Sequence, residues 1–465
     1  MNNMPIKIEK SIKYLGVWID FRLGWEDHVK YIAKRTTLIF HAFSQIARKN
    51  WGLTSDAINI IYDQIYIPII TYGCCSWGNA IHKVHLHRKL ISSQRKALIL
   101  ITRAYRTTPT CSLQVLARKP PITEIIQLEY NLHQLKIGTN ICTSTGEIRS
   151  ENYENHSPTA ESLPPYINNL FRIDPPTQPD FEIYTDGSGI DESIGCAFVV
   201  YEHNMEIHNV KGKLHKASTV FQAELLAIYM ATYWIELYQE YKNVHIISDS
   251  YSAIQLLRSR KPHPIATRIR YLFYNSTNEY SITWTRGHQG LIGNERADQL
   301  AKEAARDMTT CTIYNKICRR SVRKLLYDDI LHRWQNNWTQ KHNNITFKFV
   351  PDVKNFHDTY EWVKPSSPLT QFLTGHAKFS NYLQRFTNKR NALCAICNLQ
   401  DNIDHYIFEC ISLETERLNL KITVNSYNID WPCDHDVFIK NKEIFNAFYK
   451  LIKRHETIAT LATRD

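Results

Sequence analysis

The sequence lacks the features of a membrane-spanning or secreted protein. No run of about 18 consecutive apolar residues occurs in the chain, so no transmembrane helix is expected. The segment Met1–Lys10 is charged and has no apolar core, so it does not resemble a signal peptide. No internal repeat is visible. We therefore expect an intracellular protein, in the cytoplasm or the nucleus, that does not bind membranes.

The eleven cysteines are an odd number, and no secretion signal accompanies them. Reduced thiols are therefore expected, some of which could hold a metal. The chain has 465 residues, of which 43% are hydrophobic and 22% charged, an ordinary globular composition. This length suffices for two or three domains.

Acidic residues are scarce in the first third of the chain. Residues 1–137 contain 19 Lys and Arg but only 8 Asp and Glu, whereas the remainder contains 37 of each kind. The net charge of +11 therefore lies entirely in the N-terminal third. Such a localised basic surface is typical of a protein that binds a polyanion such as nucleic acid. The alternative is a solvated surface that only keeps the protein soluble.

Composition and periodicity divide the chain into four segments. Residues 1–137 have apolar residues at helical spacing, separated by Lys and Arg. Residues 138–178 are polar and punctuated by proline, which is typical of a linker. Residues 179–308 have the pattern of an α/β domain, and residues 309–465 are polar, aromatic and helix-like.

The α/β segment is expected to form a mixed five-stranded sheet with helices packed on it. Alternating or continuous apolar runs predict the strands, and stripes at helical spacing predict the helices between them. The predicted strands are Phe181–Thr185, Gly195–Tyr201, Glu206–Gly212, Val244–Ser248 and the run from Tyr280 to Trp284.

Four carboxylates lie at the ends of these elements. Asp186 and Asp249 end strands, whereas Glu224 and Asp298 lie near the starts of helices. Such positions can converge at one edge of a sheet, where four carboxylates would repel one another unless cations neutralise them. Oxygen ligands suit Mg²⁺ or Mn²⁺, and two such ions about 4 Å apart can support phosphodiester hydrolysis. Each carboxylate alone is more often a turn or helix-end residue, so the prediction depends on the ordered set.

Five motifs, in this order, resemble those of type 1 ribonuclease H, and together they span about 130 residues of the chain. The motifs are Ile183–Ser188, Phe221–Leu225, Ile247–Ser250, Trp284–His288 and Gly293–Asp298. The resemblance implies that Asp186 bridges two Mg²⁺ ions. It also implies that Asp298 completes the site of the ion carrying the attacking water, and that Glu224 and Asp249 hold the other ion.

The resemblance also assigns roles around these ligands. His288, on a loop between Gly287 and Gly290, would assist proton movement or product release. Contacts with the RNA strand are implied for Gly187, Ser188, Gln222 and Asn294, some of them with the 2′-hydroxyl that distinguishes RNA from DNA.

Two departures from the family pattern concern the affinity for substrate. The short interval between Asp249 and Asp298 leaves little room for the basic handle helix of many bacterial members, which retroviral members also lack. Phe221 stands where many members have a polar residue that contacts substrate. Neither departure involves a predicted metal ligand.

The flanks resemble parts of non-LTR retrotransposon reverse transcriptases. Lys13–Asp20 resembles the segment after the palm catalytic motif, and Trp25–Val29, Tyr72–Gly73 and Trp77 fit the thumb and connection. A basic thumb on a primer–template duplex would explain the charge asymmetry, although a generic basic helical domain is the alternative. Tyr327–Asp329 follows the ribonuclease H segment, so we interpret it as unrelated to a polymerase site, and polymerisation by this chain alone is not expected.

A cysteine and histidine cluster lies near residues 394–410. Cys394, Cys397, His405 and Cys410 have the ligand types and approximate spacing of a tetrahedral zinc site, with Cys433 and His435 as substitute ligands. Similar clusters follow ribonuclease H in some retrotransposons. The alternative is a set of unrelated polar or buried residues.

These observations predict an endoribonuclease that hydrolyses the RNA strand of RNA–DNA hybrids, within a retrotransposon-derived protein that lacks the polymerase active site. The cofactors would be two Mg²⁺ ions, with Mn²⁺ as a substitute, and zinc at the cysteine cluster. The partner would be nucleic acid, and protein partners are unknown. A second hypothesis is an inactive nucleic-acid-binding relic. A third is a polymerase subunit that needs a partner chain.

Overall fold

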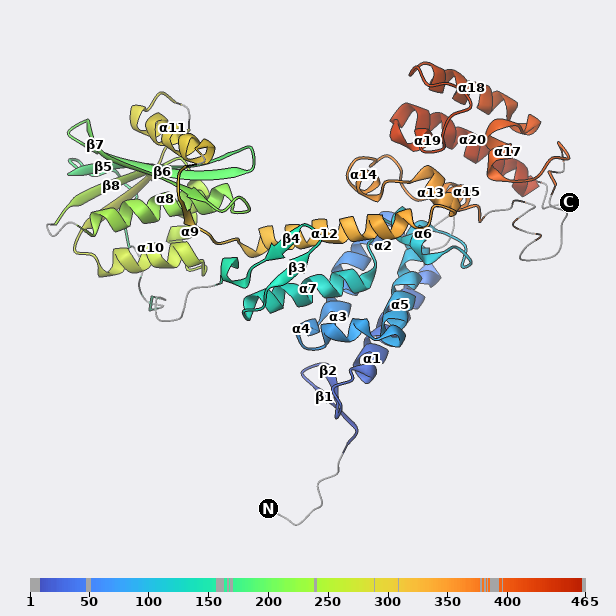
Figure 1. Ribbon diagram of the computed structural model, residues 1–465, viewed down its shortest axis with the longest axis horizontal. Helices are drawn as coiled ribbons and strands as arrows, with labels where there is room; N and C mark the ends of the chain where they lie inside the picture. The colour runs from blue at the N-terminus through green and yellow to red at the C-terminus, as the bar shows by residue number, and fades with distance from the viewer. Residues whose placement is uncertain are drawn as a thin grey trace, which may run out of the picture. The chain divides into compact units, whose positions relative to one another are not determined.

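The computed structural model describes residues 9–46, 52–155, 163–164, 167, 170–237, 241–287, 289–307, 309–376, 379, 382, 384, 393–394 and 396–461. The chain forms two compact units (Figure 1). One comprises residues 132–326, and the other combines residues 1–131 with residues 327–465. The division into four sequence segments therefore did not anticipate that the first and last of them share one unit.

A six-stranded mixed sheet organises the unit of residues 132–326. The strands are β5 (Phe181–Ile190), β6 (Ser193–Glu202), β7 (Met205–Leu214), β8 (Asn243–Ser248), β9 (Glu279–Trp284) and β10 (Thr312–Tyr314). Their spatial order is β10-β7-β6-β5-β8-β9, in which β5, β6 and β7 are antiparallel and β8 and β9 run parallel to β5. The predicted fold class is confirmed, and β10 adds a short sixth strand that the sequence did not reveal.

Helices cover both faces of this sheet (Figure 1). They are α8 (Val220–Ile235), α9 (Tyr251–Arg258), α10 (Pro264–Asn275) and α11 (Ile292–Arg306). Leu225 and Ile228 of α8 pack in one core with Ile183 and Ile246 of the strands. The alanine-rich stripe of α11 packs in a separate core, with Tyr184, Val199 and Ile247 among its neighbours. Because successive side chains of a strand point to opposite faces, the sheet carries an apolar core on each side.

Two-residue turns join β5 to β6 and β6 to β7. Asp191 and Glu192 have φ values of 46° and 62°, and His203 and Asn204 have values of 50° and 65°. Two consecutive residues with positive φ are typical of the tight hairpin turn whose twist matches that of the strands. The meander is therefore rigidly connected, which fixes the register of the strand that carries Asp186.

The polar segment predicted to be a linker contains regular structure. The strands β3 (Ile141–Thr143) and β4 (Gly146–Ile148) form a hairpin, and a 3₁₀ turn follows at Ser150–Asn152. Tyr153 is buried and forms a parallel bridge with Ile317. The part of the segment from 156 to 169 is mostly outside the described residues.

The other unit is almost entirely helical. Its N-terminal part begins with the hairpin β1 (Ser11–Tyr14) and β2 (Val17–Asp20) and continues with α1 (Glu26–Ile46), α2 (Ser55–Ile61), α3 (Ile67–Thr71), α4 (Cys74–Trp77), α5 (Val84–Thr102), α6 (Thr110–Leu116) and the part of α7 (Ile122–Lys136) up to residue 131. Its C-terminal part contains the portion of α12 (Arg319–Thr339) from residue 327 onward, α13 (Ile345–Phe349), α14 (Val353–Asp358), α15 (Ser367–Thr374), α17 (Ile403–Phe408), α18 (Glu414–Asn425), α19 (Val437–Lys440) and α20 (Lys442–Leu461). The helical structure expected for residues 1–137 from their apolar spacing is confirmed.

One apolar core joins the two parts of this unit. Val115 and Leu116 of α6 pack in the same core as Trp334 and Trp338 of α12. Tyr327 also packs against this core, and Asp329 pairs with Arg333 at 3.1 Å within α12. The Tyr327–Asp329 sequence therefore lies inside a helix and not in a hairpin. None of the helices described here is long and apolar enough to cross a membrane.

Candidate metal and nucleic-acid sites

The parallel pairing of β5 and β8 brings two aspartates together. Thr185 is paired with Ser248, the last pair of this ladder. Asp186 and Asp249 come directly after these residues, so the strand register places them side by side. β8 ends at Ser248, whereas β5 continues to Ile190 in its pairing with β6. The prediction that Asp186 ends its strand is therefore wrong: Asp186 lies within β5, at the point where the parallel neighbour β8 ends. The carboxyl end of a parallel strand is a common place for a functional site.

Helix α8 supplies the third carboxylate through a very close approach to β5. A Cβ atom added at Gly187 would lie 2.5 Å from the backbone nitrogen of Glu224 and 2.9 Å from the carbonyl carbon of Ala223. Only glycine leaves this space free. Oxygen atoms of Asp186, Glu224 and Asp249 consequently all lie within 4.8 Å of one another.

The carboxylates are held in an environment that disfavours their negative charge. Burial, followed by the nearby Asp249, raises the pKa of Asp186 to about 7. Burial, followed by the nearby Asp186, raises the pKa of Glu224 to about 9. One oxygen of each, Oδ2 of Asp186 and Oε2 of Glu224, is buried and has no hydrogen-bond partner among the described residues. Unpaired buried oxygens of this kind fit a site for hard divalent cations such as Mg²⁺.

Asp298 lies at the edge of this group. It is half-buried on α11, and its charge contributes to raising the pKa of Asp186. Its Oδ2 accepts a hydrogen bond of 2.6 Å from Nζ of Lys302, one helical turn later. It is not one of the three carboxylates within 4.8 Å. Lys302 was missed by sequence reasoning, although the four-residue spacing from Asp298 could have revealed it.

The residues predicted to contact RNA differ in their surroundings. Gly187 and Ser188 continue β5 directly beyond Asp186, and Ser188 is only 9% exposed. Asn294 is buried in the first turn of α11, and its Oδ1 has no hydrogen-bond partner among the described residues. His288 lies outside the described residues.

Gln222 has a structural role instead of the predicted contact with RNA. It is 1% exposed, and its Oε1 accepts a 2.9 Å hydrogen bond from the backbone of Thr219 in a capping box at the start of α8. Its Nε2 donates to Glu154 at 2.9 Å. Both ends of the amide are therefore engaged, so we withdraw the predicted contact. The pattern of a threonine followed by glutamine three residues later could have identified this box.

The cysteine and histidine cluster is assembled as predicted. One ligand atom from each of Cys394, Cys397, His405 and Cys410 lies within 4.8 Å of the others. Nε2 of His405 is buried without a hydrogen-bond partner among the described residues, while its Nδ1 lies 3.3 Å from Glu409. A carboxylate on the second ring nitrogen is the arrangement that orients a histidine ligand towards a metal. The four side chains therefore fit tetrahedral zinc.

The substitute ligands do not belong to this cluster. Nε2 of His435 makes a 2.7 Å hydrogen bond with Asp404, and the ring packs edge-on against Phe349 and Phe408. Cys433 packs against the large core of the helical unit. The suggestion that Cys433 and His435 replace members of the set is therefore wrong.

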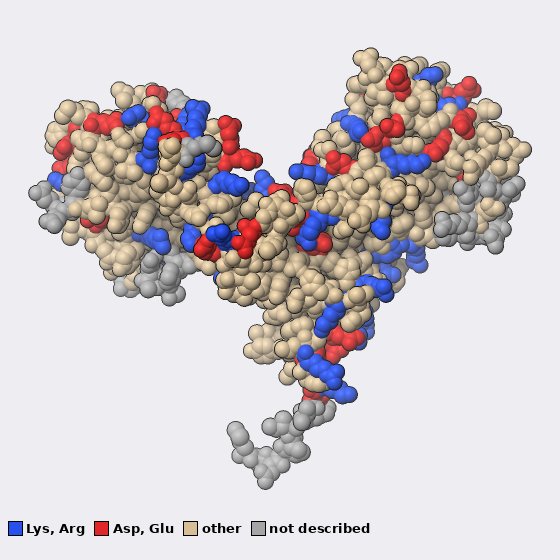
Figure 2. Space-filling view, in the orientation of Figure 1, with Lys and Arg blue, Asp and Glu red and all other residues tan. Residues whose placement is uncertain are grey.

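The helical unit presents a basic surface over α1 and α5, where Lys and Arg predominate on the face drawn in Figure 2. The side chains of Lys30, Lys34 and Arg35 on α1 and of Lys89 and Lys96 on α5 are exposed. These residues belong to the segment that carries the whole net positive charge of the chain.

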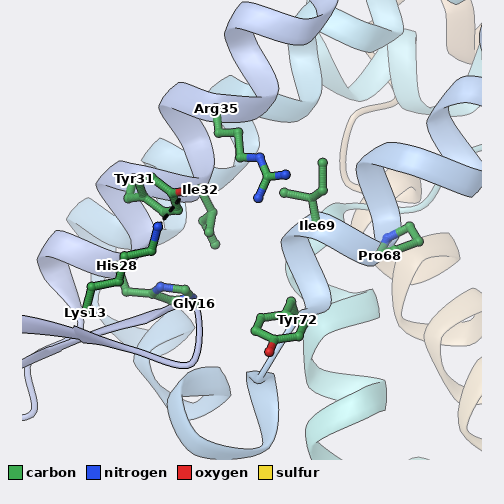
Figure 3. A pocket seen from close by; sticks show the side chains of 9 residues that line it. All are labelled: Lys13, Gly16, His28, Tyr31, Ile32, Arg35, Pro68, Ile69 and Tyr72. Atoms are coloured by element: carbon green, nitrogen blue, oxygen red, sulfur yellow. Dashed lines mark hydrogen bonds between the residues drawn. The ribbon is translucent and has the colours of Figure 1, made fainter.

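A pocket of about 300 Å³ opens between the β1–β2 hairpin, α1 and α3 (Figure 3). Its walls combine cations and aromatic rings: Nζ of Lys13 lies 3.3 Å from the hydroxyl of Tyr31 and 4.8 Å from the centre of its ring. The side chain of Arg35 extends from α1 towards Ile69. The hydroxyl of Tyr72 donates to the carbonyl of Leu15 at 2.9 Å, which ties α3 to the hairpin.

Comparison with known proteins agrees with this geometry. The family model of RNase H matches residues 178–306. Over 138 residues the chain is 32% identical to the "Retrovirus-related Pol polyprotein from type-1 retrotransposable element R1 4" of Nasonia vitripennis, covering 30% of this chain and 35% of that protein. Over 212 residues it is 27% identical to the corresponding R1 polyprotein of Popillia japonica, covering 45% of this chain and 83% of that protein.

A third relative is the "Putative 115 kDa protein in type-1 retrotransposable element R1DM" of Drosophila melanogaster. It is 29% identical over 126 residues, which cover 26% of this chain and 12% of that protein. The aligned part thus spans only about a third of the Nasonia relative and an eighth of the Drosophila relative.

Proposed function

Because residues 178–306 are a ribonuclease H domain in a protein of the non-LTR retrotransposon type, we propose that the chain is an endoribonuclease acting on RNA–DNA hybrids. The observation that carries the proposal is the group formed by Asp186, Glu224 and Asp249, in which Asp186 and Glu224 each have a buried carboxylate oxygen without a hydrogen-bond partner in the described part of the chain. Such a group is poorly suited to a structural role because mutual repulsion destabilises it without cations.

We infer that two Mg²⁺ ions, or Mn²⁺ in their place, bind here. Asp186 would contact both ions, Glu224 and Asp249 would hold one, and Asp298 would complete the site of the other after release from Lys302. When bound, the ions supply a nucleophilic water and neutralise charge on the phosphate. The chain's own contribution is to hold four carboxylates in place. The backbone of Gly187 and the hydroxyl of Ser188 would lie close to the 2′-hydroxyl of the RNA strand.

The test is cleavage of a hybrid whose two strands carry different labels, with Mg²⁺ and then with Mn²⁺. We expect cutting of the RNA strand alone, leaving a 3′-hydroxyl and a 5′-phosphate, and loss of cutting in Asp249→Asn. The matched control is Asp191→Asn on the exposed β5–β6 turn, where the same chemical change should leave activity intact. Absence of cutting by the folded wild type with either ion would favour the inactive nucleic-acid-binding relic.

The basic surface over α1 and α5 is proposed to bind the phosphate backbone of the duplex. Exposed cations neutralise phosphates and release counterions, so affinity falls steeply with salt. Replacement of Lys34, Lys89 and Lys96 by alanine should reduce the slope of log affinity against log salt by up to about 3, since each phosphate contact contributes about 0.9. A control with Lys421, Lys442 and Lys450 replaced, all exposed in the C-terminal helices, should keep the slope. Equal slopes in both triple variants would contradict this surface.

A further inference from the structure

Segments on either side of the family-matched residues 178–306 close against each other. The backbone nitrogen of Glu154 donates to the carbonyl of Ile317 at 2.9 Å, and that of Ile317 donates to the carbonyl of Asn152 at 2.7 Å. Nζ of Lys316 adds a 2.6 Å hydrogen bond to the carbonyl of Glu151. Residues 151–154 and 314–317 thus form a small parallel pairing, which we call the flank clamp.

The flank clamp also contacts the start of α8, the helix that carries Glu224. The hydroxyl of Ser218 donates to the carbonyl of Lys316 at 2.9 Å, and the backbone nitrogen of His215 donates to the carbonyl of Tyr314 at 2.9 Å. The ring of Tyr314 packs against the core that contains Ala223 and Ala227. The first turn of α8 is therefore enclosed by chain that lies outside the matched domain.

Glu154 is the side chain that connects these parts. Its Oε1 accepts hydrogen bonds from Nε2 of Gln222, at 2.9 Å, and from the hydroxyl of Tyr314. The partners lie 68 and 160 residues away along the chain. One half-buried carboxylate thus joins the preceding flank, the following flank and α8.

Gln222 transmits this contact to the metal site. It is the third residue of α8, and its Oε1 is already bound to Thr219 in the capping box. With Nε2 held by Glu154, the amide can shift only if the helix start shifts with it. Glu224 follows two residues later on the same turn, with its backbone against Gly187. A displacement of the turn therefore changes the distance between the carboxylates of Glu224 and Asp186.

We propose that Glu154 is a positioning residue for the metal site, and that the unit competent to bind the ions extends beyond residues 178–306 to include both flanks. The proposal rests on the proposed function only for the identity of the ions. Residues that hold metal ligands from outside the coordination sphere commonly change affinity by about 10-fold to 100-fold when removed.

The experiment measures Mn²⁺ affinity of the full chain by electron paramagnetic resonance, beside the melting temperature and the kcat and KM for hybrid cleavage. Glu154→Ala should weaken Mn²⁺ binding by about tenfold. Glu154→Gln keeps an oxygen that accepts from Gln222 and Tyr314, so it should restore affinity close to that of the wild type. Glu151→Ala is the matched control, because the side chain of Glu151 is exposed and accepts a hydrogen bond from Arg149 at 3.4 Å.

Unchanged Mn²⁺ affinity in Glu154→Ala, or an equal loss in the alanine and glutamine variants, overturns the proposal. If Glu154→Ala does not fold, Tyr314→Phe tests the proposal, because it removes one hydrogen-bond donor to Glu154 and keeps the packed ring. That variant should weaken Mn²⁺ binding severalfold, and wild-type affinity would refute the proposal. A wild type that binds Mn²⁺ but cuts no hybrid would reject the proposed function and leave the result for Glu154 standing.

Discussion

The contact between Gly187 and α8 makes a sharp prediction about the metal site. In Gly187→Ala, the new methyl group would lie 2.5 Å from the backbone nitrogen of Glu224 and 2.9 Å from the carbonyl carbon of Ala223. These are backbone atoms, so no side-chain rotation can relieve the clash. The start of α8 must move away from β5, and Glu224 must move away from Asp186 with it.

Overpacking of this kind destabilises proteins by about 1–3 kcal/mol. A unit of this size loses about 2–4 °C in melting temperature for each kcal/mol, so a decrease of roughly 2–12 °C is expected. The Mn²⁺ affinity should also fall, because the displaced Glu224 no longer lies at its original distance from Asp186. Calorimetry with and without Mn²⁺ measures both quantities on one sample.

Gly189→Ala, two residues further along β5, provides a matched control. Its new methyl group would meet only the tips of the side chains of Val220, at 2.9 Å, and Ile194, at 3.2 Å. These tips can turn aside, so the stability and the Mn²⁺ affinity should stay much closer to those of the wild type. If Gly187→Ala matches Gly189→Ala in both measurements, the close approach does not position Glu224 and the reasoning is refuted.

Three further predictions concern the metal sites and pH. In the presence of a chelator, Asp249→Asn should raise the melting temperature, because it removes repulsion between carboxylates. Mn²⁺ at 100 times its dissociation constant should stabilise the wild type by roughly 2.7 kcal/mol, and the variant should lose most of this stabilisation. Full stabilisation of the variant by Mn²⁺ would contradict the prediction. The purified chain should contain about one zinc ion, lost in Cys410→Ser and kept in Cys433→Ser, as measured by elemental analysis. Burial lowers the pKa of His455 to about 4 from 6.5, so the unfolded chain takes up this proton first as pH falls. Stability should therefore decrease between pH 6.5 and 4 by up to about 3 kcal/mol, and His455→Phe should remove that part of the slope in denaturant titrations.

The carboxylate site is largely readable from the sequence because its parts are local. Asp186 and Asp249 each follow an apolar run that forms a strand, and the parallel pairing of these two runs brings the aspartates together, although β5 continues beyond Asp186 to Ile190. Glu224 could be placed because α8 has a clear apolar stripe. The zinc-like cluster is local too, since its four residues span only residues 394–410, and short spacing constrains ligands before any tertiary structure forms.

Other features depend on contacts between residues far apart in the chain. The core that joins α6 to α12 connects residues 115–116 with residues 334–338, and no local pattern predicts which apolar faces will meet. The hydrogen bond between Glu154 and Tyr314 spans 160 residues, from a segment whose composition resembles a linker. A polar segment can be ordered by partners elsewhere, which composition alone does not reveal.

The sequence by itself determined the fold class, the order of the carboxylates and the chemistry they can support, because strand and helix periodicity and motif order are properties of the chain. Only the tertiary structure decided what each polar group does. It joined Nε2 of Gln222 to Glu154, 68 residues away, and set Glu154 between both flanks and α8. The physical reason is that a hydrogen-bonding side chain acts through its partner, and the partner is chosen by packing over long sequence distances.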